Sequence, residues 1–239
     1  MGIKCVIAAG GLGTRLQGFR DNDKTKVLLE VNSIPMINQQ INQLNQWGVD
    51  EFIIITNPNF DSLIREVTSQ AFPDLIINYS IQDNPKGISH AFSKAEQYIT
   101  TGDTMIFVLG DNFFEENLIK GVDLNKFSDE GGCIIFTTKV TNPNEFGVAS
   151  VDNLGNVMHI EEKPAEPQSN LAVVGLYIFD SLAMDNIRKL SPSSRGEYEI
   201  TDLINIYIDE NKCTNVEFEG WWVDAGTPDR IIELENLLT

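Results

Sequence analysis

A glycine-rich turn follows the first apolar segment of this chain. Residues 4–19 read KCVIAAGGLGTRLQGF, and the apolar run at residues 3–9 has the length of a buried strand. The turn after it contains these small residues: Gly10, Gly11, Gly13 and Thr14. Glycine allows a backbone to come close to a ligand, and the guanidinium of Arg15 favours an anionic one. The segment therefore predicts a strand that delivers an anion-binding loop, with a plain tight turn as the alternative.

Composition and charge limit the class of protein. The 239 residues are 42% hydrophobic and 22% charged, as expected for one globular domain with a sizeable core. No apolar run approaches the roughly 18 residues that cross a bilayer, so we expect a cytoplasmic protein that does not enter the membrane. The formal net charge of -18 disfavours nucleic acid as a partner. It is compatible with one bound nucleotide, because a few cations in a cleft can hold phosphate.

Cysteine and histidine form no metal-binding pattern in the sequence. Cys5, Cys133 and Cys213 are far apart and lie in apolar runs, which favours reduced core thiols over a disulfide or a metal site. The two histidines, His90 and His159, have no spaced cluster of other ligands beside them.

Apolar periodicity predicts an α/β fold. In the first half, strand-like runs alternate with amphipathic segments typical of helices. The predicted strands are residues 3–9, 52–56, 75–79 and 104–109, and the predicted helices are residues 35–47, 60–72 and 87–99. This βαβ rhythm predicts a doubly wound, mostly parallel sheet with right-handed crossovers, a Rossmann-like arrangement.

The pattern changes after about residue 130. Closely spaced strands are predicted at residues 133–140, 146–152, 157–162 and 171–179. Helices at residues 181–190 and 199–210, a strand near residues 215–218 and a helix after residue 227 follow. We expect mixed or antiparallel pairing, built onto the same sheet. The chain is therefore predicted to be one domain, residues 1–239, in which about residues 131–239 form a smaller, substrate-facing lobe.

Charged residues recur at the ends of apolar runs. Lys26 in DKTKVLLEV is either a solvated lysine or, with Arg15, part of a clamp for a polyphosphate. Asp111 in MIFVLGDNFF follows a buried strand, and ligands of open α/β sheets bind outside the carboxyl ends of the strands. It is a candidate magnesium ligand, with a helix N-cap as the alternative. Asp224 in GWWVDAGTPD ends another apolar run and could share the same ion.

Glu162 and Lys163 in MHIEEKPAEP form a further candidate site, in which they would bind sugar hydroxyls and a phosphate. Neighbouring residues of a strand point to opposite faces, so both reach one ligand only where the strand breaks. Pro164 favours such a break. The alternative is an edge strand that ends in a surface ion pair.

Two common nucleotide-binding loops do not fit the glycine-rich turn. A Walker A loop ends in Gly-Lys-Ser/Thr, and no such ending follows Gly13. A dinucleotide fingerprint needs a third glycine where Arg15 and Leu16 stand, which disfavours a nicotinamide-dependent oxidoreductase.

Seven segments, in this order along the chain, resemble those of the sugar-1-phosphate nucleotidyltransferases. They are GGLGTRL, LGDNFF, EFGV, EEKPAEPQSN, VGLYIFD, SSRGEYEITD and WVDAGT. Within that family the sequence is most similar to the glucose-1-phosphate thymidylyltransferases, in a short form without the C-terminal helical extension. The resemblance implies an Mg2+-dependent enzyme of nucleotide-sugar synthesis, serving surface polysaccharides. It would join a nucleoside triphosphate, with dTTP favoured, to a sugar 1-phosphate, with glucose 1-phosphate favoured, and release pyrophosphate.

The resemblance also implies roles for individual residues. Arg15 and Lys26 would be catalytic, holding the triphosphate and stabilising the departing pyrophosphate, and Asp111 and Asp224 would hold magnesium. Residues 1–130 would bind the nucleotide through Gly10, Gly11, Gly13, Thr14, Gln82, Gly87 and Asp111. The second part would bind the sugar phosphate through Gly147, Glu162, Lys163, Val174 and Arg195.

Departures from the family pattern leave the substrates open. Val27 and Val174 stand where glutamine and threonine are common in the thymidylyltransferases. UTP, another triphosphate or a modified sugar phosphate is therefore an alternative. A non-catalytic regulatory subunit is more distant, because the charged positions are all present. A homo-oligomer is compatible with the resemblance.

Overall fold

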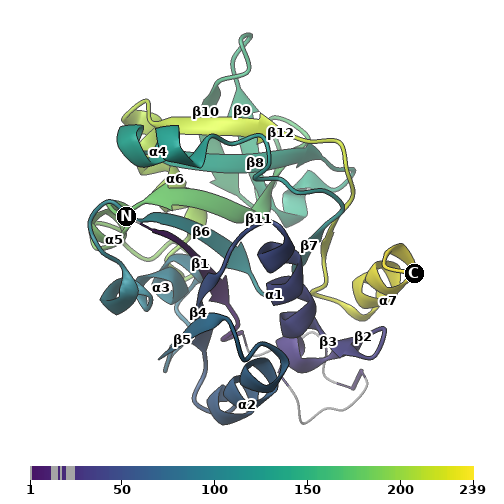
Figure 1. The fold of residues 1–239 in the computed structure, drawn as a ribbon. Coiled ribbons are helices and arrows are strands. Elements are labelled where there is room, and N and C mark those ends of the chain that lie inside the picture. The colour runs from purple at the N-terminus through teal and green to yellow at the C-terminus, as the bar shows by residue number, and fades with distance from the viewer. Residues whose placement is uncertain (1, 12–15, 17, 20–24) are drawn as a thin grey trace.

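The computed structural model describes residues 2–11, 16, 18–19 and 25–239, and these form a mixed α/β fold (Figure 1). The described residues include a nine-stranded sheet. Its strands are β1 (Ile3–Ala8), β4 (Glu51–Thr56), β5 (Ile76–Ile81), β6 (Thr104–Leu109), β8 (Cys133–Lys139), β9 (Gly147–Val151), β10 (Val157–Glu162), β11 (Leu171–Asp180) and β12 (Cys213–Glu217). The strand order is β10-β9-β11-β6-β1-β4-β5, with β8 paired to β11 and β12 paired to β8.

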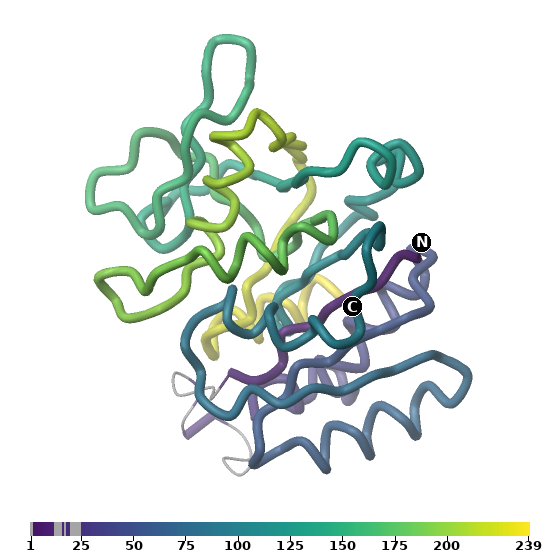
Figure 2. The backbone as a smooth tube through the Cα atoms, turned by 90° about the vertical axis from the view of Figure 1, so that its left-hand side faces the viewer, coloured from purple at the N-terminus to yellow at the C-terminus, as the bar shows by residue number. Residues whose placement is uncertain are grey.

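The sheet has a parallel part and a mixed part. Strands β6, β1, β4 and β5 run parallel, as their alternation with helices predicted. Strand β11 pairs antiparallel with β6, β8 and β9, whereas β12 runs parallel to β8. The prediction of mixed pairing on the same sheet is therefore confirmed. Figure 2 shows the early residues, in purple and blue, below the green segments of the second half. One sheet passes through both, so the division near residue 130 stays a prediction.

Helices cover both faces of the sheet, as in a doubly wound fold. On one face lie α1 (Met36–Gln46), α2 (Asp61–Ala71) and α4 (Leu124–Glu130), and on the other lie α3 (Ile88–Ser93), α5 (Ala183–Ile187) and α6 (Ile200–Asp209). Strand β4 reaches both layers, because Phe52 and Ile54 pack with the first set while Ile53 and Ile55 pack with the second. Burial on both faces explains why the strand is a continuous apolar run.

Some predicted elements differ in length, and others were missed. The helix predicted at residues 87–99 is α3 followed by a 3₁₀ turn at Glu96–Tyr98, and the helix predicted at residues 181–190 is the shorter α5. The sequence did not predict α4 or two small sheets. These pair β2 (Glu30–Val31) with β3 (Ile34–Pro35), and β7 (Asn112–Phe114) with β13 (Trp222–Asp224). Strands of two or three residues are too short to have a readable period.

The β7–β13 ribbon connects the end of β6 with the C-terminal segment. Its antiparallel register places Asp224 opposite Asn112, next to Asp111. A small core supports it, in which Phe113 and Val223 pack with Ile231 and Leu234 of α7 (Pro228–Leu237). Two aspartates that are far apart in the sequence are thus brought to one place.

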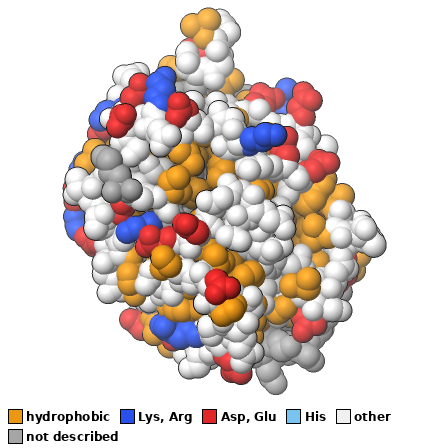
Figure 3. Space-filling view, in the orientation of Figure 1, with side chains coloured by type: hydrophobic (Ala, Val, Ile, Leu, Met, Phe, Trp, Pro, Cys, Tyr) orange, Lys and Arg blue, Asp and Glu red, His pale blue; other side chains and the backbone are white. Residues whose placement is uncertain are grey.

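The described surface mixes both signs of charge. On the face drawn in Figure 3, the described Lys and Arg side chains are scattered among Asp and Glu. Among the described residues, no helix is both long enough and apolar enough to cross a membrane. Cys5 and Cys133 are buried free thiols, whereas the free thiol Cys213 is half-buried and lies opposite Cys133 in the β8–β12 register.

Candidate active site

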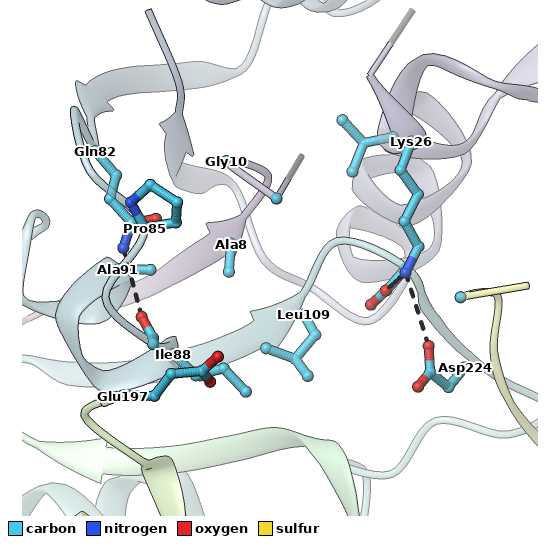
Figure 4. Close-up of a pocket in the computed structure, with 15 residues that line it drawn as sticks. Ala8, Gly10, Lys26, Gln82, Pro85, Ile88, Ala91, Leu109, Glu197 and Asp224 are labelled. Carbon is cyan, nitrogen blue, oxygen red and sulfur yellow. Dashed lines mark hydrogen bonds and ion pairs between the residues drawn. The ribbon is translucent and has the colours of Figure 1, made fainter. Parts of the chain in front are cut away.

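A cavity of about 360 Å³ lies at the carboxyl ends of the parallel strands (Figure 4). It is lined by residues that follow β1, β5 and β6, among them Gly10, Gly11, Gln82, Gly87 and Asp111. After β1, the chain forms β4 and β5 on one side of β1 in the sheet, and then β6 on the other side of β1. Such a reversal of strand order opens a crevice in which α/β proteins bind their ligands.

Three charged side chains meet at one end of this cavity, and we name them the Lys26 cluster: Lys26, Asp111 and Asp224. The ammonium of Lys26 forms an ion pair with Asp111, and its Nζ atom lies 3.9 Å from Oδ1 of Asp224. The backbone N–H of Ala225 donates to the carbonyl oxygen of Asp111 at 2.8 Å, which fixes the two aspartate segments together. A Cβ atom on Gly226 would lie 3.0 Å from Asp224 Oδ1, so glycine leaves room beside the carboxylate.

The donor set of this cluster fits magnesium. Two carboxylates point at the same ammonium, and Mg2+ prefers one or two carboxylates completed by water and phosphate oxygens. In the part of the chain that the structure describes, no group of three or more His, Cys, Asp or Glu side chains forms a metal cage. A cation here would therefore need water or substrate oxygens as further ligands.

Gln82 and Gly87 line the opposite end of the cavity, where Figure 4 draws Gln82 beside Pro85. Gln82 is 4% exposed, and its amide donates to the carbonyl oxygen of Gly87 at 3.4 Å. Gly87 has φ +102, and a Cβ atom there would stand 2.6 Å from both the nitrogen and the carbonyl oxygen of Tyr198. Only glycine fits this close approach.

A second cavity of about 100 Å³ adjoins the first. Both are lined by Ile88, Leu109 and Asp224. Glu162 and Lys163 line the second one together, because β10 ends at Glu162 and Lys163 has the left-handed φ of +47. The strand breaks where the sequence predicted a break.

Charged partners surround Glu162. Burial raises the pKa of Glu162, and the negative charge of Glu199 adds to this, although Lys163 and Arg195 oppose it. The guanidinium of Arg195 donates to Glu162 at 3.1 Å and also lies 3.5 Å from a carboxylate oxygen of Glu199 and of Glu197. Arg195 lines neither cavity, but acidic side chains hold it beside Glu162, which lines the second.

The structure brings most of the predicted residues to the two cavities. Gly10, Gly11, Lys26, Gln82, Gly87, Asp111 and Asp224 line the first, and Gly147, Glu162 and Lys163 line the second. Arg15, Gly13 and Thr14 lie outside the described residues. Val174 is fully buried in the core and lines neither of the two cavities, so the structure does not bring it to the site.

Several residues that line the cavities were not predicted from the sequence, among them Asn112, Thr201, Glu197 and Trp222. Asn112 is central: its Oδ1 accepts from the N–H of Gly175 at 3.0 Å and from Trp222 Nε1 at 2.7 Å, and its Nδ2 donates to Asp111 at 2.9 Å. Trp222 stands two residues before Asp224, and Asn112 directly follows Asp111, so both neighbour a candidate metal ligand in the sequence, and that was the signal that could have pointed to them.

Comparison with known proteins gives the class of this fold and site. The sequence profile of the family described as "Nucleotidyl transferase" matches residues 4–239. The chain is 34% identical over 238 residues to the low-salt glycan biosynthesis nucleotidyltransferase of Haloferax volcanii, covering 99% of this chain and 66% of that protein. It is 32% identical over 239 residues to a glucose-1-phosphate thymidylyltransferase of Neisseria gonorrhoeae, covering 99% of this chain and 82% of that protein.

Solved structures agree with this result. The structure of a Bacillus anthracis protein, described as a glucose-1-phosphate thymidylyltransferase and bound to a sucrose, has a TM-score of 0.88 and 35% identity, with 99% of this chain and 94% of that chain covered. A UDP-glucose pyrophosphorylase with bound UDP-glucose has a TM-score of 0.85 at 22% identity, which supports the fold alone. The chain belongs to the nucleotidyl transferase family, whose members are enzymes.

Proposed function

We propose that this enzyme transfers a nucleotidyl group from a nucleoside triphosphate, with dTTP favoured, to a sugar 1-phosphate, with glucose 1-phosphate favoured. The products would be a nucleotide-sugar and pyrophosphate. The proposal draws on the thymidylyltransferases to which the chain is similar. UTP is the main alternative donor.

One observation carries the proposal. Two cavities meet at Asp224, next to Lys26 and Asp111, and each has the chemistry of a different substrate. The first has a glycine turn and a buried amide, which suit a nucleotide. The second combines Glu162 and Lys163, which suit sugar hydroxyls and a phosphate. The junction is where two phosphates would react.

The residues of the junction supply what this reaction needs. A phosphate oxygen of the sugar substrate attacks the α-phosphorus and forms a new P–O bond, while the bond from that phosphorus to the bridging oxygen of pyrophosphate breaks. The attacking oxygen is already anionic, so the enzyme needs no strong general base. Catalysis then depends on bringing two anions into line and stabilising the leaving group. Lys26 is suited to that task, and Arg15 keeps the same predicted role.

Asp111 and Asp224 would hold magnesium when it is bound, and the ion would neutralise phosphate charge. Without it, these carboxylates would repel an anionic substrate. Their ion pair with Lys26 limits that repulsion.

Pyrophosphate release tests the proposal directly. Glucose 1-phosphate and magnesium are supplied with dTTP, UTP, CTP, ATP or GTP in parallel. Release with dTTP well above the others supports a thymidylyltransferase, whereas a UTP preference keeps the reaction and changes the donor. No release with any triphosphate and a panel of sugar phosphates would contradict the proposed function.

Lys26→Ala tests the catalytic assignment. Because it removes a positioned charge at the reacting centre, we expect kcat to fall by about 10²–10³ while the fold remains intact. Lys126→Ala is the matched control, since Lys126 is an exposed lysine of α4 that pairs with Glu130. Near-wild-type turnover in Lys26→Ala, with normal circular dichroism, would show that Lys26 does not act on the phosphates.

A further inference from the structure

His90 and Gln82 form a hydrogen bond at the nucleotide end of the first cavity. His90 lies in α3, and Gln82 directly follows β5. Nε2 of Gln82 lies 2.9 Å from Nδ1 of His90 and 3.4 Å from the carbonyl oxygen of Gly87. A carbonyl oxygen only accepts hydrogen bonds, so the group that faces Gly87 must be the amide NH2. The same NH2 then donates to His90, and Nδ1 must be the acceptor.

This arrangement determines which atom of Gln82 can meet a ligand. The amide NH2 is directed at two protein acceptors, while Oε1 lies towards Gly10, 3.3 Å from the place of a Cβ atom on that glycine. An acceptor oxygen fits a base that presents an N–H. Uracil and thymine carry N3–H between two carbonyls, whereas N3 of cytosine is unprotonated and repels an acceptor.

We propose that His90 is a positioning residue for base selection: its neutral imidazole, protonated at Nε2, holds the Gln82 oxygen towards the base and so favours uracil or thymine over cytosine. The inference rests on the proposed function, because it takes Gln82 as the side chain that meets the base. Protonation of His90 would turn Nδ1 into a donor. The Gln82 amide would then lose this acceptor or turn over, and would present its NH2 to the base instead.

The surroundings of His90 keep the ring neutral. Burial lowers the pKa of His90, and the positive charges of Lys94 and Lys86 lower it further. The ring of Tyr198, from the segment before α6, faces it with centroids 6.4 Å apart. Strand β1 and helices α5 and α6 also pack on α3, and they contribute apolar residues to the shared core, including Val6, Ala183 and Leu203. Base selection should therefore be lost only at a pH below the ordinary pKa of histidine.

The tautomer of His90 is the first measurement. The chain has two histidines, so nitrogen NMR of the ring atoms gives two sets of signals, and His159→Gln assigns them. We expect Nδ1 of His90 to be unprotonated and Nε2 to be protonated at neutral pH. A ring protonated at Nδ1 would overturn the proposal, whatever the activity.

The second measurement is the ratio of kcat/KM for dTTP to that for dCTP, between about pH 5.5 and 8. Ionisation of the triphosphate is common to both and cancels in the ratio. If UTP proves to be the better donor, UTP and CTP are compared instead. In the wild-type chain the ratio should fall about tenfold as His90 becomes protonated, which is the effect of one hydrogen bond.

Two variants separate positioning from a structural role. His90→Gln keeps an acceptor but does not titrate, so its ratio should stay near the wild-type neutral-pH value and be flat with pH. His90→Phe has no acceptor, and its ratio should be about tenfold lower throughout. His159→Gln is the control, since His159 is exposed on β10, and should follow the wild-type profile.

The outcomes are distinguishable. The same pH dependence in the wild type and in His90→Gln would overturn the role of His90 and leave the proposed function intact. No turnover of the wild-type chain with any triphosphate would overturn the proposed function and this inference together.

Discussion

Asp103 is a buried carboxylate just before β6, at the opposite end of the sheet from the cavities. It accepts from the N–H of Gly2 at 2.9 Å, from the N–H and hydroxyl of Thr100 at 2.9 and 2.8 Å, and pairs with Lys4 at 2.9 Å. Burial alone would raise the pKa of Asp103, but these hydrogen bonds outweigh it and lower the pKa to about 2. The carboxylate thus fastens β1 to the segment before β6.

Asp103→Asn should lose about 2 kcal/mol of unfolding free energy at pH 7, because the ionised carboxylate of Asp103 is stabilised more in the folded chain than in the unfolded chain. A lowered folded-state pKa gives stability that is present above the unfolded pKa and is lost as the pH falls towards about 2. Urea unfolding from about pH 7 to 3 should therefore show the wild type and the variant converging. Asp129→Asn, on the exposed side of α4, is the control. A constant difference at every pH would contradict this account.

At the residue scale, a functional side chain can be predicted from the sequence when it stands at the end of an apolar run. Asp111 and Lys163 were found in this way, since a strand end and a strand break leave a signal in the local sequence. Gln40 leaves no such signal. Gln40 is a buried amide of α1 that donates to the carbonyl oxygens of Leu109 at 2.7 Å and of Asn112 at 3.0 Å. Its role depends on a contact across some 70 residues, which no local pattern encodes.

At the element scale, long buried strands were predicted within one or two residues, because both faces are apolar. The short elements were not: β7 and β13 have three residues each, and their pairing joins segments about 110 residues apart. The helix predicted at residues 87–99 ends early, at Ser93. The position where this helix begins is determined by tertiary contacts with the segment before α6.

Gly87→Ala tests that contact between α3 and the segment before α6. The N–H of Tyr198 donates to Lys86 at 2.8 Å, and a methyl group at position 87 would meet the Tyr198 backbone at 2.6 Å. Backbone atoms cannot give way cheaply, so we expect the variant to lose about 2–4 kcal/mol of unfolding free energy and to bind the proposed triphosphate at least tenfold more weakly.

Gly155→Ala is the matched control for this prediction. Gly155 also has a left-handed φ, +86, but a Cβ atom there meets nothing within 4 Å. It should lose about 1 kcal/mol from backbone strain alone. Equal losses of stability in the two variants would mean that the contact with Tyr198 contributes nothing.

At the scale of the whole molecule, the candidate site combines residues from both parts of the chain. Glu197, Asp224 and Gly226 line the same cavity as Gly10 and Gln82. The order of motifs indicated which segments belong together, but their distances depend on how β11 joins β6, β8 and β9. That pairing is a property of the complete sheet.

The net charge of the whole chain affects how its proposed anionic substrates approach. The formal charge of -18 repels an anionic triphosphate over long distances, whereas Lys26 attracts it only within the cavity. Added salt screens exposed, distant charges first, with a Debye length of about 10 Å at 0.1 M, and affects partly enclosed contacts less.

We therefore expect kcat/KM for the triphosphate to rise about two- to threefold between about 0.01 and 0.15 M NaCl at constant free magnesium. Sites in which attraction dominates show the reverse. Urea unfolding in the same salt series separates this effect from a change in stability, and kcat at saturating substrate should stay nearly constant because screening acts on the encounter. A steady fall of kcat/KM with salt would mean that the local cations outweigh the acidic surface even at a distance, and that the charge of the molecule as a whole does not oppose substrate capture.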